Sequence, residues 1–506
     1  MTTPTILLPA LVAVPLLLSA LLVVVRHRWL ERLLMVGAPL ATTAIAVWLV
    51  GATSHSNVLV TNVGGYPAVF AINLVADSVT ALMMLIMSAV TAVASLMLTL
   101  TDEDRRRFVP ALVLLLHTGV NGALMTADLF NLFVFIEVML MPSYALIAVT
   151  GSWRRLGIGR MFLLVNIFTG TLLLIGVGFV YGVTGTVNLA ALADAGSRDA
   201  RGASALAMVL FTLSVKAGAF PVHGWLPRAY SGTSGAMMML FSALHTKIAL
   251  YAIYRIYAIT FGKPGPVLTT VAVIAVSTML VGAVASFGET RIRGILAYQM
   301  VSGIGHILLA LVLFSERSLS AGLFYMSHHI LTIAALLSAA AAIEFTYGSG
   351  RLTQLGGLMR REKALAACMA AGLLSLIGLP PTSGTWGKLS LVLASAEGPG
   401  RTPTIYIGAI VLASIASIMA LQHLWREVFW GPLPSEYLPD DPKKGRGDPE
   451  PLTDDVRVPT RLKVIPVALT GVVIAVFFAA GSIMPFFGDA GQSLIDSYPY
   501  VAQVMP

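Results

Sequence analysis

Residues 211–226 read Phe211-Thr-Leu-Ser-Val-Lys-Ala-Gly-Ala-Phe-Pro-Val-His-Gly-Trp-Leu226 and continue an apolar run that is long enough to enter a bilayer, yet they include Lys216. A lysine ammonium at the centre of a membrane helix costs at least about 2.5–3.5 kcal/mol. Pro221 removes a backbone donor and clashes with the preceding turn, so a helix break is predicted there. Because a broken helix at membrane depth needs protein or a water-filled cavity around it, we expect an ion path beside Lys216. A lysine that reaches the interface from a helix end is the structural alternative.

The composition indicates an all-α polytopic membrane protein. Of the 506 residues, 57% are hydrophobic and 11% are charged, and the mean hydropathy is +0.85; soluble chains have about 25% charged residues. The run 6–25 is too long for a signal-peptide core and lacks a basic region before it, so it is predicted as the first span in the lipid bilayer. The single cysteine, Cys368, excludes an intrachain disulfide, and no nucleotide-binding loop or zinc-protease helix occurs. We therefore expect no enzyme, no cofactor, no metal site and no nucleic-acid partner.

About fourteen transmembrane helices are predicted from the apolar runs. Their approximate ranges are 5–25, 33–52, 73–100, 108–127, 129–150, 158–182, 203–222, 233–259, 266–287, 292–314, 319–344, 364–395, 404–429 and 463–487. Residues 431–460 are rich in Pro, Asp and Lys and predict a polar linker. A short surface helix around 189–192 and an external hairpin over 57–72 are also predicted.

Lysine and arginine are distributed unevenly among the predicted loops. Of the 32, the connections from odd-numbered to even-numbered spans hold 23 and the opposite loops hold five. The remaining four lie within spans: Lys216, Lys247, Arg255 and Lys388. The positive-inside rule assigns the richer loops to the cytoplasm, so both termini are expected on the external side.

A second break, at Pro380 and Pro381, suggests an internal repeat. It lies in Gly378-Leu-Pro-Pro-Thr-Ser-Gly-Thr-Trp-Gly-Lys388, about 160 positions after Pro221, which matches five spans with their loops. Two Pro/Gly-interrupted segments in corresponding halves indicate a transport site. An odd number of spans in each unit requires the second unit to be inverted. The expected divisions are N-terminal helices at 1–107, five-helix repeats at 108–262 and 263–430, a cytoplasmic polar linker at 431–462, and the last helix with an external tail at 463–506.

Glu137 is the one acidic residue predicted deep inside a span, within Phe130-Asn-Leu-Phe-Val-Phe-Ile-Glu-Val-Met-Leu-Met-Pro142. A carboxylate alone in lipid takes up a proton, whereas beside a cation it stays ionised. Lys216 is the expected partner, and the two are expected to titrate jointly, so that moving the carboxylate away makes the lysine release its proton. A fixed ion pair that holds two helices together is the structural alternative.

Further titratable groups are spread over separate spans. In chain order they are His245, Lys247, His306, His328, His329 and Lys388. A single histidine is often only a packing residue, but several such groups at membrane depth favour a hydrated chain of proton carriers. No carboxylate or cysteine that would complete a histidine-based metal site lies near them.

The motifs resemble one known family of transport proteins. The run Phe130-Asn-Leu-Phe-Val-Phe-Ile-Glu-Val-Met-Leu140, followed by Ser143-Tyr-Ala-Leu, is similar to the D subunit of the Mrp-type multisubunit sodium/proton antiporters. Residues 216–227 and 380–388 resemble the wider family, which includes the antiporter-like subunits of respiratory complex I and of membrane-bound hydrogenases. The resemblance covers essentially the whole chain. The length argues against the A-type Mrp protein, which carries a long C-terminal extension, whereas the final lysine, Lys388, also suits the N subunit of complex I.

The resemblance implies fourteen helices, with spans 4–8 and 9–13 as inverted repeats and with broken helices at spans seven and twelve. It implies Glu137 and Lys216 as a modulated pair, Lys247 as the central relay and Lys388 as the terminal carrier. Many relatives have a lysine shortly after the histidine of span eleven, where this chain has Thr332 and Ile333. The link between Lys247 and Lys388 is therefore expected to depend on His328, His329 and water.

Two functions remain open. One is the proton-translocating subunit of a secondary antiporter in a bacterial cell membrane, which exchanges cytoplasmic Na+ for external H+ with A-like, C-like and small Mrp-type partner subunits. The alternative is a proton-pumping subunit of a redox complex, which neighbouring genes for quinone and iron–sulphur subunits would reveal. A scaffold with a degenerate path is disfavoured by the four retained relay groups. The spans contain no carboxylate cluster that resembles a hard-cation cage, so Na+ is expected to cross through a partner subunit.

Overall fold

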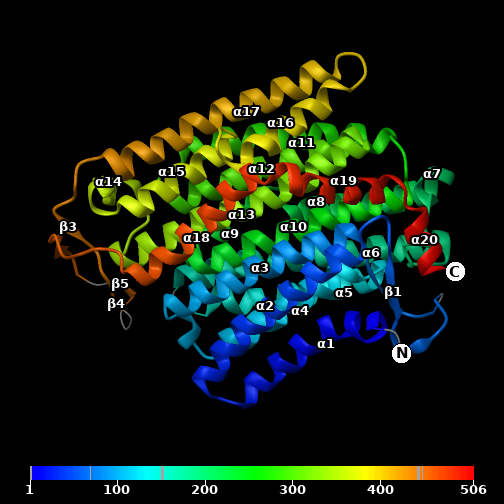
Figure 1. Ribbon diagram of the computed structural model, residues 1–506, viewed down its shortest axis with the longest axis horizontal. Helices are drawn as coiled ribbons and strands as arrows, with labels where there is room; N and C mark the ends of the chain where they lie inside the picture. The colour runs from blue at the N-terminus through cyan, green and yellow to red at the C-terminus, as the bar shows by residue number, and fades with distance from the viewer. Residues whose placement is uncertain (1–2, 69, 150–152, 442–444, 447, 506) are drawn as a thin grey trace.

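Long helices run side by side along the longest axis of the molecule in the computed structural model, which describes residues 3–68, 70–149, 153–441, 445–446 and 448–505 (Figure 1). Both ends of the chain lie at one end of this bundle. The polar segment that contains strands β3 (Glu436–Tyr437) to β6 (Glu450–Pro451) lies at the opposite end. Because the two ends of the chain lie at the same end of the bundle, the arrangement fits an even number of membrane crossings.

Twelve helices of the described residues are long and apolar enough to cross a membrane, and two shorter apolar helices, Val109–Met125 and Lys363–Ile377, accompany them. The helices in the predicted spans are α1 (Thr3–Val24), α2 (Arg28–Ala52), α3 (Ser78–Leu100), α4 (Val109–Met125), α5 (Leu129–Ala148), α6 (Trp153–Thr184), α8 (Ala200–Ala217), α10 (Gly235–Thr260), α11 (Pro266–Ala285), α12 (Ile292–Leu313), α13 (Glu316–Tyr347), α15 (Lys363–Ile377), α16 (Ser383–Ala396), α17 (Thr402–Trp425) and α18 (Thr460–Phe478). The short helices are α7 (Ala195–Arg198), α9 (Trp225–Ser231), α14 (Leu358–Arg361), α19 (Ala480–Ile495) and α20 (Tyr498–Val504). The expected all-α polytopic class is confirmed.

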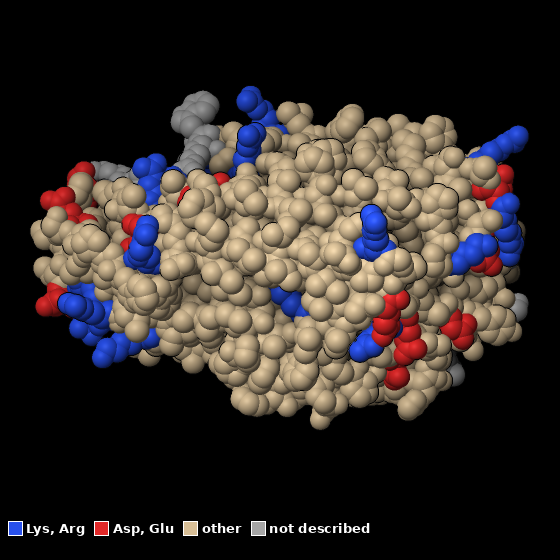
Figure 2. All heavy atoms as spheres, turned by 90° about the horizontal axis from the view of Figure 1, so that it is seen from above, with Lys and Arg blue, Asp and Glu red and all other residues tan. Residues whose placement is uncertain are grey.

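The surface and the centre of the bundle differ in character. Figure 2 shows charged side chains gathered mainly toward the two ends of the long axis, with a broad and largely uncharged middle. In the centre, every residue of α10 is buried. Since α10 carries His245 and Lys247, these two side chains lie within the protein and do not face lipid.

Two spans are broken where glycine and proline follow a helix. α8 ends at Ala217, and Gly218 adopts φ +83°, a conformation that glycine favours. The side chain of Trp225 donates a hydrogen bond from Nε1 to the carbonyl of Val215 at 3.1 Å, in addition to the one that this carbonyl accepts from the N–H of Gly218. α15 ends similarly before Pro380, with Gly378 at φ +97°. The helix interruptions at Pro221 and at Pro380 and Pro381 therefore fall at the predicted positions.

Three local predictions require correction. The third helix begins at Ser78 and not at residue 73, because residues 73–76 form strand β2 (Asn73–Ala76), which pairs with β1 (Leu59–Asn62). The predicted hairpin is thus present and extends beyond residue 72; its side of the membrane stays a prediction. The predicted surface helix at 189–192 is wrong: these residues form turns, because the side chain of Asn188 accepts the N–H of Ala190 at 2.9 Å. The polar linker contains two short antiparallel pairs, β3 with β6 and β4 (Asp440–Asp441) with β5 (Gly445–Arg446), which composition alone does not reveal.

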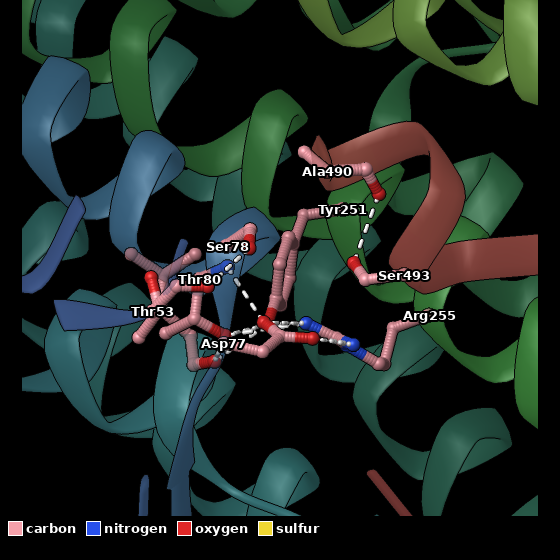
Figure 3. Close-up of polar contacts among 9 residues, drawn as sticks. Thr53, Asp77, Ser78, Thr80, Tyr251, Arg255, Ala490 and Ser493 are labelled. Carbon is pink, nitrogen blue, oxygen red and sulfur yellow. Dashed lines mark hydrogen bonds and ion pairs between the residues drawn. The ribbon is translucent and has the colours of Figure 1, made fainter. Parts of the chain in front are cut away.

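A buried ion pair joins α10 to α3 (Figure 3). Arg255 binds both carboxylate oxygens of Asp77, at 2.5 and 2.6 Å, and the two side chains are 5% and 2% exposed. Arg255 also donates to the hydroxyls of Thr80 and Tyr251 at 3.2 and 3.3 Å. The ring of Tyr500 lies 5.1 Å from its guanidinium carbon. These contacts fix α10 at Arg255, about two helical turns after Lys247 on the same helix.

We predict that replacing one member of this pair is far more damaging than replacing both. Arg255→Met leaves a buried carboxylate without its cation and should destabilise the chain by about 3–5 kcal/mol, whereas Asp77→Asn with Arg255→Met should recover part of that loss. Thermal aggregation of the solubilised protein measures the difference. The control is Arg228→Met, which removes an exposed arginine. An Arg255→Met protein as stable as the unmodified chain would contradict the prediction.

Candidate functional site

Glu137 and Lys216 meet where α5, α6 and α8 converge. Lys216 Nζ lies 3.6 Å from Glu137 Oε1, and the two side chains are 4% and 18% exposed. Lys216 also donates to the carbonyl of Asn166 at 3.4 Å. A Cβ at Gly170 on α6 would lie 2.5 Å from Glu137 Oε1, so glycine leaves the room that the carboxylate occupies. The structure thus brings together the two residues that the sequence singled out as a pair.

A small cavity extends from Lys216 toward His245. Its volume of about 10 Å³ approaches the space that one water needs. His245 contacts the hydroxyl of Ser143 at 2.8 Å through Nε2 and that of Tyr230 at 3.2 Å through Nδ1. No sequence pattern singled out Tyr230, and Ser143 drew notice only as part of a motif. Through its contacts with these two hydroxyls, His245 belongs to a polar cluster that spans α5, α9 and α10.

Lys247 and Lys388 are buried beside hydroxyl groups. Lys247 is fully enclosed and donates to Thr246 Oγ1 at 3.2 Å, and Lys388 donates to Ser414 Oγ at 2.8 Å. Neither lysine forms an ion pair within the part of the chain that the structure describes. The two lysines therefore lack the carboxylate that accompanies Lys216.

The other three histidines that the sequence singled out lie around one tyrosine. The ring of Tyr325 lies 5.1 Å from His306, 5.5 Å from His328 and 6.1 Å from His329, measured between ring centroids. His328 Nδ1 contacts the hydroxyls of Ser383 at 2.8 Å and of Thr332 at 3.1 Å. Thr332, which the family resemblance singled out, therefore takes part in the polar cluster. Tyr325 was missed, although it precedes the histidine pair by only three residues.

The helices that carry these groups form a continuous packed series. α10 packs against α13, and α13 packs against both α12 and α16. Lys247, the three histidines and Lys388 therefore occupy neighbouring helices. Among the described residues, no group of three or more His, Cys, Asp or Glu side chains is arranged to hold a metal ion.

The other end of α10 is also fixed by a polar contact. Ser234 caps the helix by accepting the N–H of Met237, and its hydroxyl donates to Glu103 Oε2 at 2.6 Å. Thr101 contacts the second carboxylate oxygen at 3.2 Å. Burial raises the pKa of Glu103, and the hydrogen bond from Ser234 only partly offsets that effect. α10 is thus held by Glu103 at its start and by Asp77 near its end.

A bundle with two broken spans, buried lysines and an intramembrane carboxylate–lysine pair defines an antiporter-like membrane protein. Residues 126–415 match the family described as NADH:quinone oxidoreductase/Mrp antiporter, transmembrane. The chain is 32% identical to the D subunit of the Na+/H+ antiporter of Alkalihalophilus pseudofirmus, over 82% of this chain and 84% of that protein. It is 30% identical to the D subunit of the Na+/H+ antiporter of Bacillus subtilis, over 84% of this chain and 87% of that protein. The chain belongs to the family of Mrp antiporter D subunits, which is related to the antiporter-like subunits of complex I.

Solved structures agree with this assignment. The whole chain superimposes on a chain of the Mrp complex from Dietzia sp. DQ12-45-1b, with a TM-score of 0.95, 39% identity and full coverage of both chains. A chain of an archaeal membrane-bound sulfane sulfur reductase has a TM-score of 0.85 at 24% identity, covering 98% of this chain and 99% of that one. A chain of respiratory complex I from Thermus thermophilus has a TM-score of 0.76 at 21% identity, covering 95% of this chain and 99% of that one. The likenesses to the reductase and to complex I show only that the fold is shared. The resemblance drawn from the motifs is confirmed, and the chain is a multi-pass membrane protein.

We predict that Gly170→Ala disturbs the pair without touching either charged residue. The added methyl group takes the place of the Glu137 carboxylate, and displacing a reacting group by about 1 Å can lower a rate by up to roughly 100-fold. Ion-driven proton flux in membrane vesicles should fall about tenfold or more. The matched control is Gly178→Ala on the same helix, where a new Cβ meets nothing within 4 Å. Equal flux in the two variants would refute the prediction.

Proposed function

We propose that this chain is the proton-translocating subunit of a multisubunit secondary antiporter that exchanges cytoplasmic Na+ for external H+. The observation that carries the proposal is the Glu137–Lys216 pair at 3.6 Å, with Lys216 buried at the end of a broken helix. The relatives are named as D subunits of Na+/H+ antiporters, which supports the choice of ion. The chain acts as part of a transporter, not as an enzyme. Complex I shares the fold at only 21% identity, which does not favour the redox alternative.

In this proposal Glu137 controls how firmly Lys216 holds its proton. Two unit charges about 4 Å apart interact by roughly 4 kcal/mol at an effective dielectric constant near 20. While the carboxylate stays close, this attraction stabilises the ammonium form of Lys216. When the carboxylate moves away, the buried ammonium loses its compensation and releases the proton. The cavity between Lys216 and His245 gives that proton a route toward α10.

The later steps use the groups that lie beyond α8. Lys247 on α10 receives the proton with help from His245 and passes it toward the cluster on α13. His329 and His328 then carry it to Lys388, and His306 tunes that cluster through its contact with Tyr325. The hydroxyls of Thr332 and Ser383 provide hydrogen-bond partners along this route. The relay thereby crosses the helices that pack in series.

We further propose that residues 108–262 and 263–430 are two inverted five-helix repeats within a set of fourteen spans. The similar breaks, each a positive-φ glycine followed by proline, support this division. N-terminal helices occupy 1–107, the cytoplasmic linker 431–462, and the last span with an external tail 463–506. Inversion places the two broken helices in opposite orientations around the relay.

The proposed setting is a bacterial cell membrane, with both termini outside. The charge bias of the loops supports this orientation. The likeness to a chain of the Dietzia Mrp complex supports assembly with A-like, C-like and small subunits. Na+ is assigned to a path through one of those partners, and H+ to the relay in this chain.

A switch and a fixed structural pair predict different outcomes for substitutions at Glu137 and Lys216. If the pair is a switch, Glu137→Gln leaves assembly largely intact but abolishes the pH dependence of exchange or shifts it strongly. Lys216→Ala does at least as much damage, because it removes the proton carrier. Abundance in the membrane and Na+-driven proton flux are measured for both single variants and the double variant. Flux like that of the unmodified protein in the double variant would rule out the switch.

The orientation predicts opposite labelling of two exposed loop positions. Arg106→Cys should react only from the cytoplasm and Lys263→Cys only from outside, in a chain whose Cys368 has been replaced. Membrane-impermeant maleimide on intact cells and on inverted vesicles gives the readout. Labelling of position 106 in intact cells would reverse the orientation.

A further inference from the structure

A basic pocket lies where the turn between α1 and α2 meets the start of α4. Its volume is about 340 Å³. Its charged lining consists of five arginines and one glutamate: Arg26, Arg28, Arg105, Arg106, Arg107 and Glu31. The turn, dark blue in Figure 1, lies at the end of the bundle away from the chain termini. The relay residues do not line this pocket, so it is separate from the proposed proton path.

The nearby acidic side chains do not neutralise the pocket. Asp104 binds Arg32 at 2.5 Å, and Asp102 binds Arg105 at 2.8 Å. Four arginines of the pocket form no ion pair with any residue that the structure describes: Arg26, Arg28, Arg106 and Arg107. Since Glu31 supplies only one negative charge, the pocket has a clear surplus of positive charge. It therefore suits an anion with more than one acceptor oxygen.

The surroundings of the pocket are apolar and face outward. Val24 is 78% exposed, Trp29 60% and Leu33 56%. Phe108 lies at the edge of the pocket under the guanidinium of Arg107, 4.4 Å from its carbon. Tryptophan is enriched where hydrocarbon meets headgroups. Charge recognition and exposed apolar surface thus occur together at one level of the bundle.

We propose that this pocket binds the phosphodiester headgroup of an anionic phospholipid, whose acyl chains lie along the outer faces of α1 and α2. Guanidinium groups match phosphate oxygens in bidentate geometry, which favours arginine over lysine at such sites. Basic pockets between membrane helices at the cytoplasmic surface bind anionic headgroups. A free phosphate would use the arginines alone, and an acidic protein segment would leave the apolar surface without a role. A phospholipid uses both, and this site does not depend on the proposed transport function.

The test measures lipid binding to the full chain, purified with any subunits that remain attached and then delipidated. Phosphatidylglycerol and cardiolipin should bind and raise the melting temperature, whereas phosphatidylcholine should not. The fourfold variant Arg26→Gln, Arg28→Gln, Arg106→Gln and Arg107→Gln should bind anionic lipid at least about tenfold more weakly, because it lacks four of the five guanidinium groups that attract the headgroup. Native mass spectrometry reports the affinity.

The control variant removes four exposed basic residues elsewhere on the chain: Arg360→Gln, Lys363→Gln, Arg457→Gln and Arg461→Gln. An equal loss in this control would show general surface attraction and overturn the site. Competition by inorganic phosphate as effective as that of lipid would mean a small-anion site. Loss of an attached partner protein from the fourfold variant, with lipid binding unchanged, would mean a protein-docking site.

A second measurement uses the unmodified protein and so does not depend on whether the variant folds. Phosphatidylglycerol with a photoreactive group near its headgroup should crosslink to peptides that cover residues 22–33 or 105–110. Excess unlabelled phosphatidylglycerol should suppress these crosslinks, and phosphatidylcholine should not. Crosslinks confined to other segments would overturn the proposal.

Discussion

A charge enclosed in a low-dielectric bundle must find polar partners, and this requirement organises the structure around α10. The helix is wholly buried and carries Lys247, so its position depends on contacts with the protein alone. Glu103 holds its start through Ser234, and Asp77 holds its other end through Arg255. Because both anchors are carboxyl groups with several hydrogen bonds, a shift of α10 would leave buried polar atoms without partners. A helix fixed in this way holds Lys247 at a defined place in the centre of the bundle.

The three buried lysines of the proposed relay have different partners. Lys216 faces a carboxylate, whereas Lys247 and Lys388 face hydroxyls. An ammonium beside a carboxylate is strongly compensated, but one beside a hydroxyl receives only a dipole. Among the described residues, Lys216 is therefore the lysine of the proposed relay that has a carboxylate partner, and Lys247 and Lys388 have none. In the proposed relay, this difference distinguishes the first lysine from the two later ones, although all three groups are of one residue type.

Much of the fold could be predicted from the sequence because the signals are local. Apolar runs locate the spans, and Gly218 with Pro221 locates a break, since each acts on its immediate neighbours. Glu137 and Lys216 could be paired because few charges remain at membrane depth. Arg255 was recognised, but its partner Asp77 was not, because the carboxylate caps a helix whose start was predicted five residues too early. Tyr325 was not predicted as part of the cluster, because the sequence does not show which histidines from other positions pack around its ring. The arginines near residues 26 and 106 indicated orientation, but only the structure shows that they share a pocket.

The ion pair between Asp77 and Arg255 has a consequence for synthesis. The two residues are 178 positions apart, so α3 leaves the ribosome well before the helix that compensates its carboxylate. At about 5–20 residues per second, that interval lasts on the order of 10–40 seconds. During this time the carboxylate has neither its cation nor the enclosing helices, and it must remain hydrated or take up a proton. The first three spans are therefore expected to stay loosely packed near the translocon, and the bundle closes around α10 only when Arg255 arrives.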